Sequence, residues 1–290
     1  MGKYLIINAD DFGMSHEFNA AIVDLMKNKY ISSTSIMANG CAYHEALSLI
    51  RTEHLNNIGV HLTLTRDAFD AEEPLIYHSL TSSESLEQDE RGLYTTSSDL
   101  KRQAKFDDIV SEIKAQIQKV SEDGINYTHI DNHMYSLMPR MGYEGYRAFF
   151  KAYHGINNTP KVCGVRIAKN YYNETGLNYV WGSKKIGLYV RPAMGLLGLR
   201  GVDYCFAFQY YAEKYSTLEA KIELLDTFFR NMRNGVTELH VHPCIYSDVL
   251  KRYNPFWENR VHEYEMLKQY GENRLKNDYG ITMISYQDVK

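Results

Sequence analysis

The stretch LIINADDFG, residues 5–13, runs from an apolar segment directly into two adjacent acids, Asp10 and Asp11. The apolar part predicts a buried strand, and the acids stand where that strand should end. Two neighbouring carboxylates repel each other, and each resists the loss of its water. We therefore expect a positive partner close to them, which the rest of the chain must supply.

The composition of the 290-residue chain indicates a soluble globular protein, with room for one barrel domain or two smaller domains. The formal net charge of −4 gives no reason to expect a nucleic-acid partner. There is no apolar run of about 18 residues or more and no signal-peptide pattern, so we expect a cytoplasmic protein without membrane spans. The four cysteines show no C-x-x-C spacing and are expected to be reduced thiols.

Short apolar segments alternate with longer amphipathic ones along most of the chain. Repeated strand–helix units predict parallel strands with helices packed outside them. Eight candidate strands suit a (β/α) barrel, regular or distorted, better than an open sheet. They are Tyr4–Asn8, Thr34–Asn39, Asn57–Leu64, Tyr127–Asp131, Lys161–Ile167, Val202–Phe208, Val236–His242 and Ile281–Ser285.

Three of the amphipathic segments predict long helices, over residues 99–121, 216–235 and about 259–278. The second is expected to open with a capping box in which Ser216 and Glu219 satisfy each other's backbone N–H groups. The third is more polar than the others, which indicates a helix on the surface.

Two regions, residues 67–98 and 168–201, interrupt the alternation of strands and helices. Neither is of low enough complexity to be a domain linker. We expect both to be long loops on one barrel, and loops of this length often cover a substrate site. Residues 1–290 are therefore predicted to form a single domain.

The carboxyl ends of the strands are where a parallel α/β barrel collects its chemistry. Taken singly, a histidine or acid there has an ordinary role as a hydrogen-bonded core residue or a turn former. Four predicted strand ends carry such residues together, and the two-residue period of a strand places several on one face. They are Asp10 with Asp11, then His61, then His129 with Asp131 and His133, and finally Glu238 with His240 and His242.

This combination favours a metal site. One carboxylate and two imidazoles form a ligand set typical of a divalent cation, with positions left open for water and substrate. Such a cation would resolve the repulsion between the adjacent acids, because one Asp binds it while the other stays ionised beside it. The pattern is moderately specific for a metallohydrolase and says little about its substrate.

Five segments resemble the YdjC-like carbohydrate deacetylases, a family that includes chitooligosaccharide deacetylase. The resemblance implies a distorted (β/α) barrel of the polysaccharide-deacetylase-like kind with a single divalent metal ion, Mg²⁺ or Zn²⁺. It also implies hydrolysis of an N-acetyl group on an amino sugar within a short oligosaccharide, and it makes a homodimer plausible. The segments are LIINADDFGMS (5–15), ISSTSIMANG (31–40), IGVHLTLT (58–65), THIDNHMYSLMP (128–139) and ELHVHPC (238–244).

The same resemblance implies roles for individual residues. The family often continues its H-x-D-x-H motif with more histidines, whereas Met134, Tyr135 and Leu137 follow here, so contacts to the sugar are expected to differ. The metal ligands would be Asp11, His61 and His133, the general base Asp10, and the general acid His242, protonated at the working pH. Arg166 would lie near the site, and we expect His129 and Asp131 to orient the ligands through hydrogen bonds.

Two alternatives remain. One is another barrel metallohydrolase, although the NADD sequence at the first strand is unlike the H-x-H of amidohydrolases, and a phosphoesterase should carry a basic cradle. The other is a non-catalytic sugar-binding or regulatory protein on the same fold. Asp10 and His242 count against this alternative, because binding alone needs neither a base nor an acid.

Overall fold

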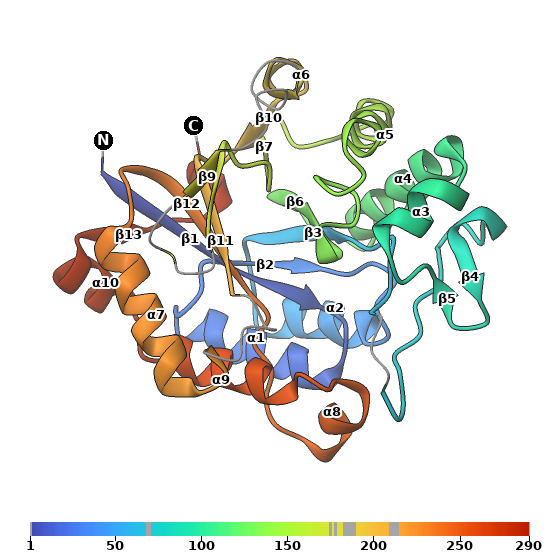
Figure 1. Ribbon diagram of the computed structural model, residues 1–290. Coiled ribbons are helices and arrows are strands. Elements are labelled where there is room, and N and C mark those ends of the chain that lie inside the picture. Colours follow the sequence, from blue (N-terminus) through green and yellow to red (C-terminus); the bar gives the residue numbers. More distant parts are fainter. Residues whose placement is uncertain are drawn as a thin grey trace.

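The computed structural model describes residues 2–67, 71–173, 176, 179–181, 190–208 and 215–289. In these ranges a curled sheet of 11 strands forms the centre of the molecule, and helices cover its outside (Figure 1). The order across the sheet is β10 (Leu199–Gly201), β7 (Cys163–Val165), β6 (His129–Asn132), β3 (Ile58–Leu62), β2 (Ser33–Ile36), β1 (Lys3–Phe12), β12 (Gly235–Val241), β11 (Tyr204–Ala207), β8 (Asn170–Tyr172) and β9 (Tyr179–Trp181). The remaining strand, β13 (Ile281–Met283), pairs with β1.

The predicted distorted (β/α) barrel is confirmed. Ladders such as β1 with β12 and β3 with β6 are parallel, and β8 with β9 is antiparallel. The sheet forms a half-barrel rather than a closed ring, because its path ends at β10 and β9, which are not neighbours in the part of the chain described. A small second sheet pairs β4 (Glu87–Asp89) with β5 (Gly92–Leu93).

All eight predicted strands are present, and the short strands β4, β5, β8, β9 and β10 were missed. The last three of these lie in the region 168–201, and the β4–β5 hairpin lies within 67–98. Both regions therefore hold more structure than the predicted loops, although residues 68–70, 174, 175, 177, 178 and 182–189 lie outside the described ranges. Strands of two or three residues are too short for a two-residue alternation to be recognised.

The described residues form helices α1 to α10, and three of the helix predictions need correction. The segment 99–121 is two helices, α3 (Ser97–Gln103) and α4 (Phe106–Glu122), rather than one. The segment 259–278 is two helices rather than one, with Gly271 as the N-cap of the second. The N-cap of α7 is Thr217, whose side chain accepts a hydrogen bond from the Ala220 N–H, so the capping box from Ser216 to Glu219 does not form. The bounds are α1 (His16–Lys27), α2 (Tyr43–Thr52), α3 (Ser97–Gln103), α4 (Phe106–Glu122), α5 (Tyr143–His154), α6 (Arg191–Leu196), α7 (Leu218–Asn231), α8 (Asp248–Tyr253), α9 (Trp257–Leu267) and α10 (Glu272–Tyr279). None of the helices within the described ranges is long and apolar enough to cross a bilayer.

Helix α4 illustrates how the outer helices fix the strand ends. Its apolar residues recur every three or four positions and are buried, among them Ile113 and Ile117. On the same buried surface, Gln116 accepts a hydrogen bond from the Thr63 N–H and donates one to the Thr63 carbonyl, both at 2.8 Å. This pair of bonds holds the chain immediately after β3 in place.

His129 lies flat between two glycines of neighbouring strands. A Cβ at Gly59 on β3 would come within 2.4 Å of His129 Nε2, and one at Gly164 on β7 would come within 3.0 Å of the His129 Cβ. The imidazole also stacks on Tyr286, with ring centroids 4.2 Å apart and planes 14° apart. Gly59 is needed because the His129 ring fills the space where its side chain would lie, and Gly164 is needed because a Cβ there would come within 2.3 Å of Tyr286 Cδ1.

We predict that Gly59→Ala lowers the free energy of unfolding by about 1–3 kcal/mol, because the added methyl group overpacks a buried site that has no room to relax. The midpoint of urea unfolding measures this effect. Gly195→Ala is the matched control: a methyl group there would meet no atom within 4 Å, and Ala is the better helix former, so it should leave stability equal or slightly higher. Equal midpoints for Gly59→Ala and the wild type would contradict the prediction.

Candidate metal and active site

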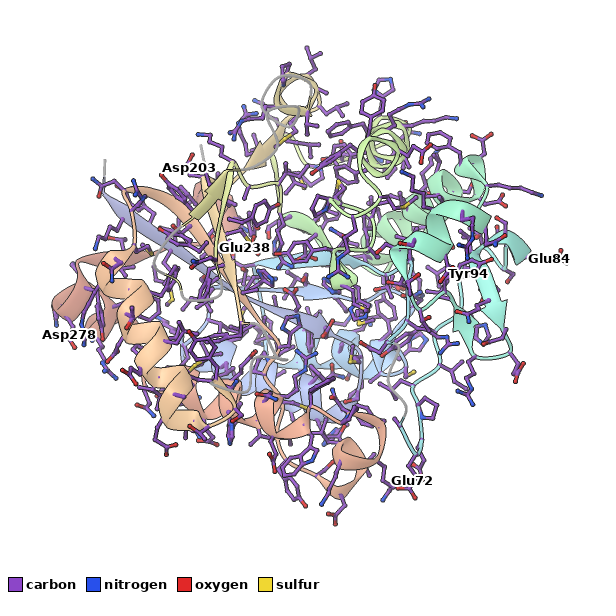
Figure 2. All side chains as sticks on the ribbon, in the orientation of Figure 1. Glu72, Glu84, Tyr94, Asp203, Glu238 and Asp278 are labelled. Carbon is purple, nitrogen blue, oxygen red and sulfur yellow. The ribbon has the colours of Figure 1, made fainter. Side chains whose placement is uncertain are left out.

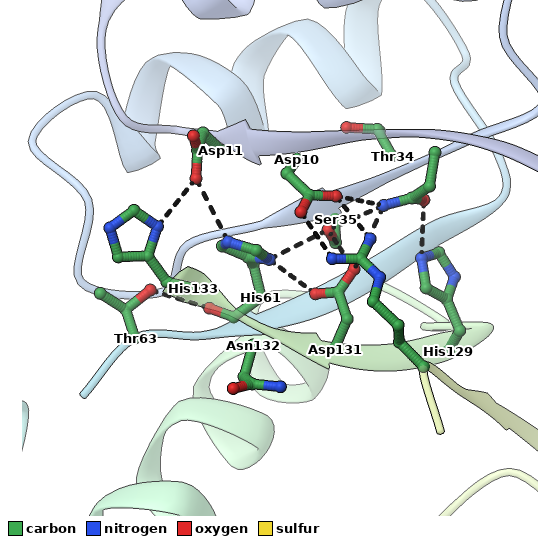
Figure 3. A network of polar contacts seen from close by, with 12 residues as sticks. Asp10, Asp11, Thr34, Ser35, His61, Thr63, His129, Asp131, Asn132 and His133 are labelled. Atoms are coloured by element: carbon green, nitrogen blue, oxygen red, sulfur yellow. Dashed lines mark hydrogen bonds and ion pairs between the residues drawn. The ribbon is translucent and has the colours of Figure 1, made fainter. Parts of the chain in front are cut away.

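The two adjacent acids lie at a β-bulge in β1. Ala9 pairs with Thr34 of β2 and Phe12 pairs with Ile36, so three steps along β1 oppose two along β2. Asp11 has a φ of 67°, in the left-handed region that Asp tolerates better than most residues. In a regular strand, neighbouring side chains point to opposite faces. The bulge turns both carboxylates toward the polar groups of the interior (Figure 3).

Asp11 meets His61 of β3 and His133, which directly follows β6. Its Oδ1 lies 3.2 Å from His61 Nε2 and 3.1 Å from His133 Nδ1. One ligand-type atom from each of the three residues lies within 4.8 Å of the other two, and all three side chains are buried (Figure 3). The structure therefore brings together the three residues that the sequence assigns to the metal.

The chemistry of this cluster fits a divalent cation. Asp11 Oδ2 and His61 Nε2 are buried and have no hydrogen-bond partner among the described residues, whereas His133 Nε2 lies 3.6 Å from Asp67 Oδ1. Buried polar atoms without a partner are rare and destabilising. A cation held by one carboxylate and two imidazoles would satisfy such atoms. These three residues could therefore hold a metal ion.

Asp131 orients His61 through Nδ1, the ring nitrogen that does not face Asp11. His61 Nδ1 donates a hydrogen bond of 2.6 Å to Asp131 Oδ1, and the Ser35 hydroxyl donates one of 2.8 Å to Asp131 Oδ2. A carboxylate on the far nitrogen of a histidine fixes its tautomer and ring orientation for metal binding. Burial lowers the pKa of His61, but Asp131 and Asp11 outweigh it and raise the pKa to about 10.

Arg166 supplies the positive partner that the adjacent acids require. Its two terminal nitrogens donate to the two oxygens of Asp10, each at 2.6 Å. One of them also lies 2.8 Å from Asp131 Oδ2, and Nε donates to Glu238 Oε1 at 2.8 Å. Burial raises the pKa of Asp10, but Arg166 outweighs it and holds the pKa well below its usual range. Asp10 is therefore ionised at neutral pH.

His242 lies just beyond the end of β12, with Nε2 3.8 Å from Asp10 Oδ2. Its side chain is 17% exposed, unlike the almost fully buried ligands. Its backbone N–H donates to Glu263 Oε2 at 2.6 Å. Burial and the nearby Arg260 lower the pKa of His242 to about 3. The expectation that this histidine is protonated at the working pH therefore does not hold for the metal-free protein.

His129 contacts none of the three candidate ligands directly. Its Nε2 lies 2.9 Å from Asn8 Oδ1, and burial lowers its pKa to about 4, so it is neutral. The Asn8 amide donates to Asp10 Oδ1 at 2.9 Å and to Asp131 Oδ2 at 3.2 Å. His129 thus acts on the site through Asn8.

Three contributors were missed in the sequence. Asn8 stands two positions before Asp10, a spacing that could have placed it on the same face. Ser35 lies in a buried strand whose four residues are all polar or β-branched, which is a weaker signal. Asp67 follows β3, and its Oδ1 lies 3.6 Å from His133 Nε2. Nothing in the local sequence distinguishes Asp67 from an ordinary loop residue.

Comparison with known proteins identifies the family of this chain. A sequence model of the family described as YdjC-like protein matches residues 4–271. The chain belongs to the YdjC-like family. The predicted family membership is therefore confirmed, and the match covers all the candidate site residues.

Similar relatives carry the name carbohydrate deacetylase. The protein of that name from Thermoanaerobacter pseudethanolicus is 28% identical over 99% of this chain and 100% of its own length. The one from Halalkalibacterium halodurans is 27% identical over 97% of this chain and 99% of its own length. A crystal structure titled as a putative cellobiose-phosphate cleavage protein from Enterococcus faecalis V583 has a TM-score of 0.72 and 23% identity, covering 99% of this chain and 98% of that one. At this identity the structural likeness concerns the fold alone.

We predict that metal binding at pH 7 releases about two protons. Burial lowers the pKa of His133, but Asp67 and Asp11 outweigh it and raise the pKa to about 9. Both His133 and His61 are therefore positively charged, with a proton on each ring nitrogen, in the metal-free protein at pH 7. Histidine ligands must be neutral, so each loses one proton on binding and the apparent affinity rises with pH. Calorimetric titration with Zn²⁺ in buffers of different ionisation enthalpy measures this release.

The exposed His44 provides the control, because His44→Ala should leave the proton release unchanged. A binding enthalpy that does not depend on the buffer would show that both imidazoles are already neutral and would contradict the prediction.

Proposed function

We propose that this protein is a metal-dependent carbohydrate deacetylase that removes N-acetyl groups from amino sugars in short oligosaccharides. Membership of the YdjC-like family and the names of its relatives support a sugar deacetylase. The buried cluster of Asp11, His61 and His133 is the observation that carries the metal dependence. Asp10 beside this cluster favours an enzyme over a binding protein, because a sugar-binding site needs no ionised acid next to a metal.

Asp11, His61 and His133 would hold one divalent cation, either Mg²⁺ or Zn²⁺. When bound, the cation supplies Lewis-acid chemistry that polarises a carbonyl group and makes water more acidic. Asp131 keeps His61 in the tautomer that leaves Nε2 free to bind, through the hydrogen bond at Nδ1. Asp67 is placed to do the same for His133, with its carboxylate 3.6 Å from the other ring nitrogen.

Asp10 acts as the general base. Arg166 holds its carboxylate in a bidentate pair, which fixes its direction and keeps it ionised. The same pair makes Asp10 a weak base, so it can accept a proton only from water that is already acidified. As the water oxygen bonds to the acetyl carbon, the proton moves to Asp10.

His242 acts as the general acid, and it must first gain a proton because it is neutral in the resting state. Asp10 Oδ2 at 3.8 Å is close enough to pass on the proton taken from water after a small movement. His242 then protonates the sugar nitrogen as the carbon–nitrogen bond breaks. Acetic acid and a free amine leave, the acid passes its proton to the amine in solution, and both catalytic side chains return to their starting state.

Acetate release from N,N′-diacetylchitobiose, with and without a chelator, tests the proposal. We expect release by the metal-loaded protein, loss of release on chelation, and recovery when Zn²⁺ or Mg²⁺ is added back. Release that survives chelation would overturn the metal dependence. A metal-loaded protein that releases no acetate from any acetylated amino sugar would favour a sugar-binding protein or a different hydrolase.

We predict that Asp10→Asn keeps the bound metal and lowers kcat by roughly 10²–10⁴-fold, because the amide cannot accept the proton. Metal content by mass spectrometry and acetate release together measure the two effects. Wild-type turnover by Asp10→Asn would exclude Asp10 as the base.

His61→Ala should behave differently and lose both the metal and turnover, because it removes one of three ligands. Comparison of this variant with Asp10→Asn separates binding of the metal from transfer of the proton. Retention of a full equivalent of metal by His61→Ala would contradict the ligand assignment.

A further inference from the structure

A cavity of about 430 Å³ lies beside the candidate active site. Its walls are the run Thr-Thr-Ser-Ser at residues 95–98, together with Thr65, Met134 and Arg140. None of these residues takes part in the proposed proton transfers or in holding the metal. The volume is within the range of roughly 300–1,000 Å³ that is typical of small-molecule sites.

Two backbone segments connect this cavity to the candidate metal ligands. Met134 directly follows His133, and both Met134 and Tyr135 have a φ of 53°, in the left-handed region. On the other side, the segment after β3 contributes Thr65 to the cavity, and two residues later Asp67 approaches His133. A molecule in the cavity would therefore lie next to the group that reacts.

The walls are held in place by buried hydrogen bonds. The Arg66 N–H donates to the Tyr94 carbonyl at 2.9 Å, and Arg66 Nε donates to the Leu93 carbonyl at 2.9 Å. These bonds tie the segment that contains Thr65 to the chain that leads into residues 95–98. The cavity is thus a built feature of the fold rather than a gap between independent loops.

The Thr65 hydroxyl indicates that this site takes a ligand. Thr65 is only 1% exposed, and its Oγ1 has no hydrogen-bond partner among the described residues. A buried hydroxyl without a partner destabilises a protein, because the loss of its hydrogen bonds to water is not repaid. The cavity that Thr65 lines is the space from which a partner could come.

The lining chemistry favours a neutral, polyhydroxylated ligand. The hydroxyl groups of Thr65, Thr95, Ser97 and Ser98 can each donate and accept, and the Arg140 guanidinium can donate. The Thr96 hydroxyl instead caps α3, donating to Asp99 Oδ2 and accepting from the Asp99 N–H. Met134 offers a flexible apolar contact of the kind that packs against irregular surfaces. The lining contains no carboxylate that would repel ring hydroxyls or select a cation.

We propose that this cavity is the subsite for the sugar ring next to the one that is deacetylated. The inference rests on the proposed function and names the residues that would set the preference for an oligosaccharide over a monosaccharide. The Thr65 hydroxyl forms a hydrogen bond with the neighbouring ring, and Thr95, Ser97, Ser98 and Arg140 bind its remaining hydroxyls. The substrate thereby spans the metal cluster and the cavity.

Binding of N,N′-diacetylchitobiose to the catalytically impaired Asp10→Asn protein tests the subsite without turnover. Adding Thr65→Val should weaken binding about tenfold, as expected for the loss of one hydrogen bond to the ligand. The melting temperature should be unchanged or higher, because valine has the same shape and removes an unpaired hydroxyl. A merely structural role for Thr65 would instead lower the melting temperature and leave the affinity unchanged.

Thr282→Val on the exposed part of β13 is the matched control and should change neither quantity. In the otherwise wild-type enzyme, Thr65→Val should lower the preference for the disaccharide over N-acetylglucosamine, taken as the ratio of kcat/KM values, by about tenfold. Equal affinities with and without Thr65→Val, or no disaccharide binding to Asp10→Asn, would overturn the subsite. Failure of the proposed function is recognised separately, as the absence of acetate release from both sugars by the metal-loaded wild type.

Discussion

Two adjacent carboxylates can face the same buried interior only if their strand departs from the regular pleat. The bulge in β1, with Asp11 in the left-handed region, is that departure. It sends Asp11 toward His61 and His133 and Asp10 toward Arg166, so that two neighbours in sequence take separate partners (Figure 3). A left-handed residue of this kind stores about 1–3 kcal/mol of strain, and the surrounding pairings of β1 with β2 and β12 hold it in place.

A single guanidinium, that of Arg166, is shared by three buried carboxyl groups beside the candidate site. Arg166 faces Asp10, Asp131 and Glu238, and removing one partner from such a buried group costs about 3–5 kcal/mol. One guanidinium cannot hold three carboxylates ionised equally. Burial raises the pKa of Glu238 to about 7 despite Arg166, and the Tyr286 hydroxyl donates to Glu238 Oε2 at 2.5 Å. Figure 2 shows Glu238 inside the molecule, whereas Glu72, Glu84 and Asp278 lie at its edge. Glu238 is therefore the weakest acid of the three carboxyl groups that face Arg166, since the pKa values of Asp10 and Asp131 are lowered.

The sequence pattern predicts the features that depend on residues close together in the chain. It does not predict those that depend on contacts between residues far apart in the chain. Alternating strands and helices predict the barrel, and histidines at strand ends predict which residues gather. The bulge was not predicted, because nothing local shows that Asp10 and Asp11 share a face. Asp67 could not be predicted because it reaches the site through a contact with His133, far away in sequence. The neutral state of His242 depends on burial and on the distant Arg260, which lower its pKa. The capping box failed because Thr217, one residue after Ser216, offers an equally good side chain.

The short segment after β3 joins the two halves of the site. It follows β3, which carries His61, and ends with Asp67 beside His133. Gln116 fixes it at Thr63, and the Tyr94 carbonyl fixes it at Arg66. Because its backbone is anchored by these bonds, side chains facing the cavity can change without moving the histidines. After β6, Met134 and Tyr135 both have a φ of 53°, so the backbone changes direction directly after His133. Of the residues that depart from the histidines of the family's motif, Met134 lines the cavity, whereas the Tyr135 hydroxyl lies 3.1 Å from His240 Nε2.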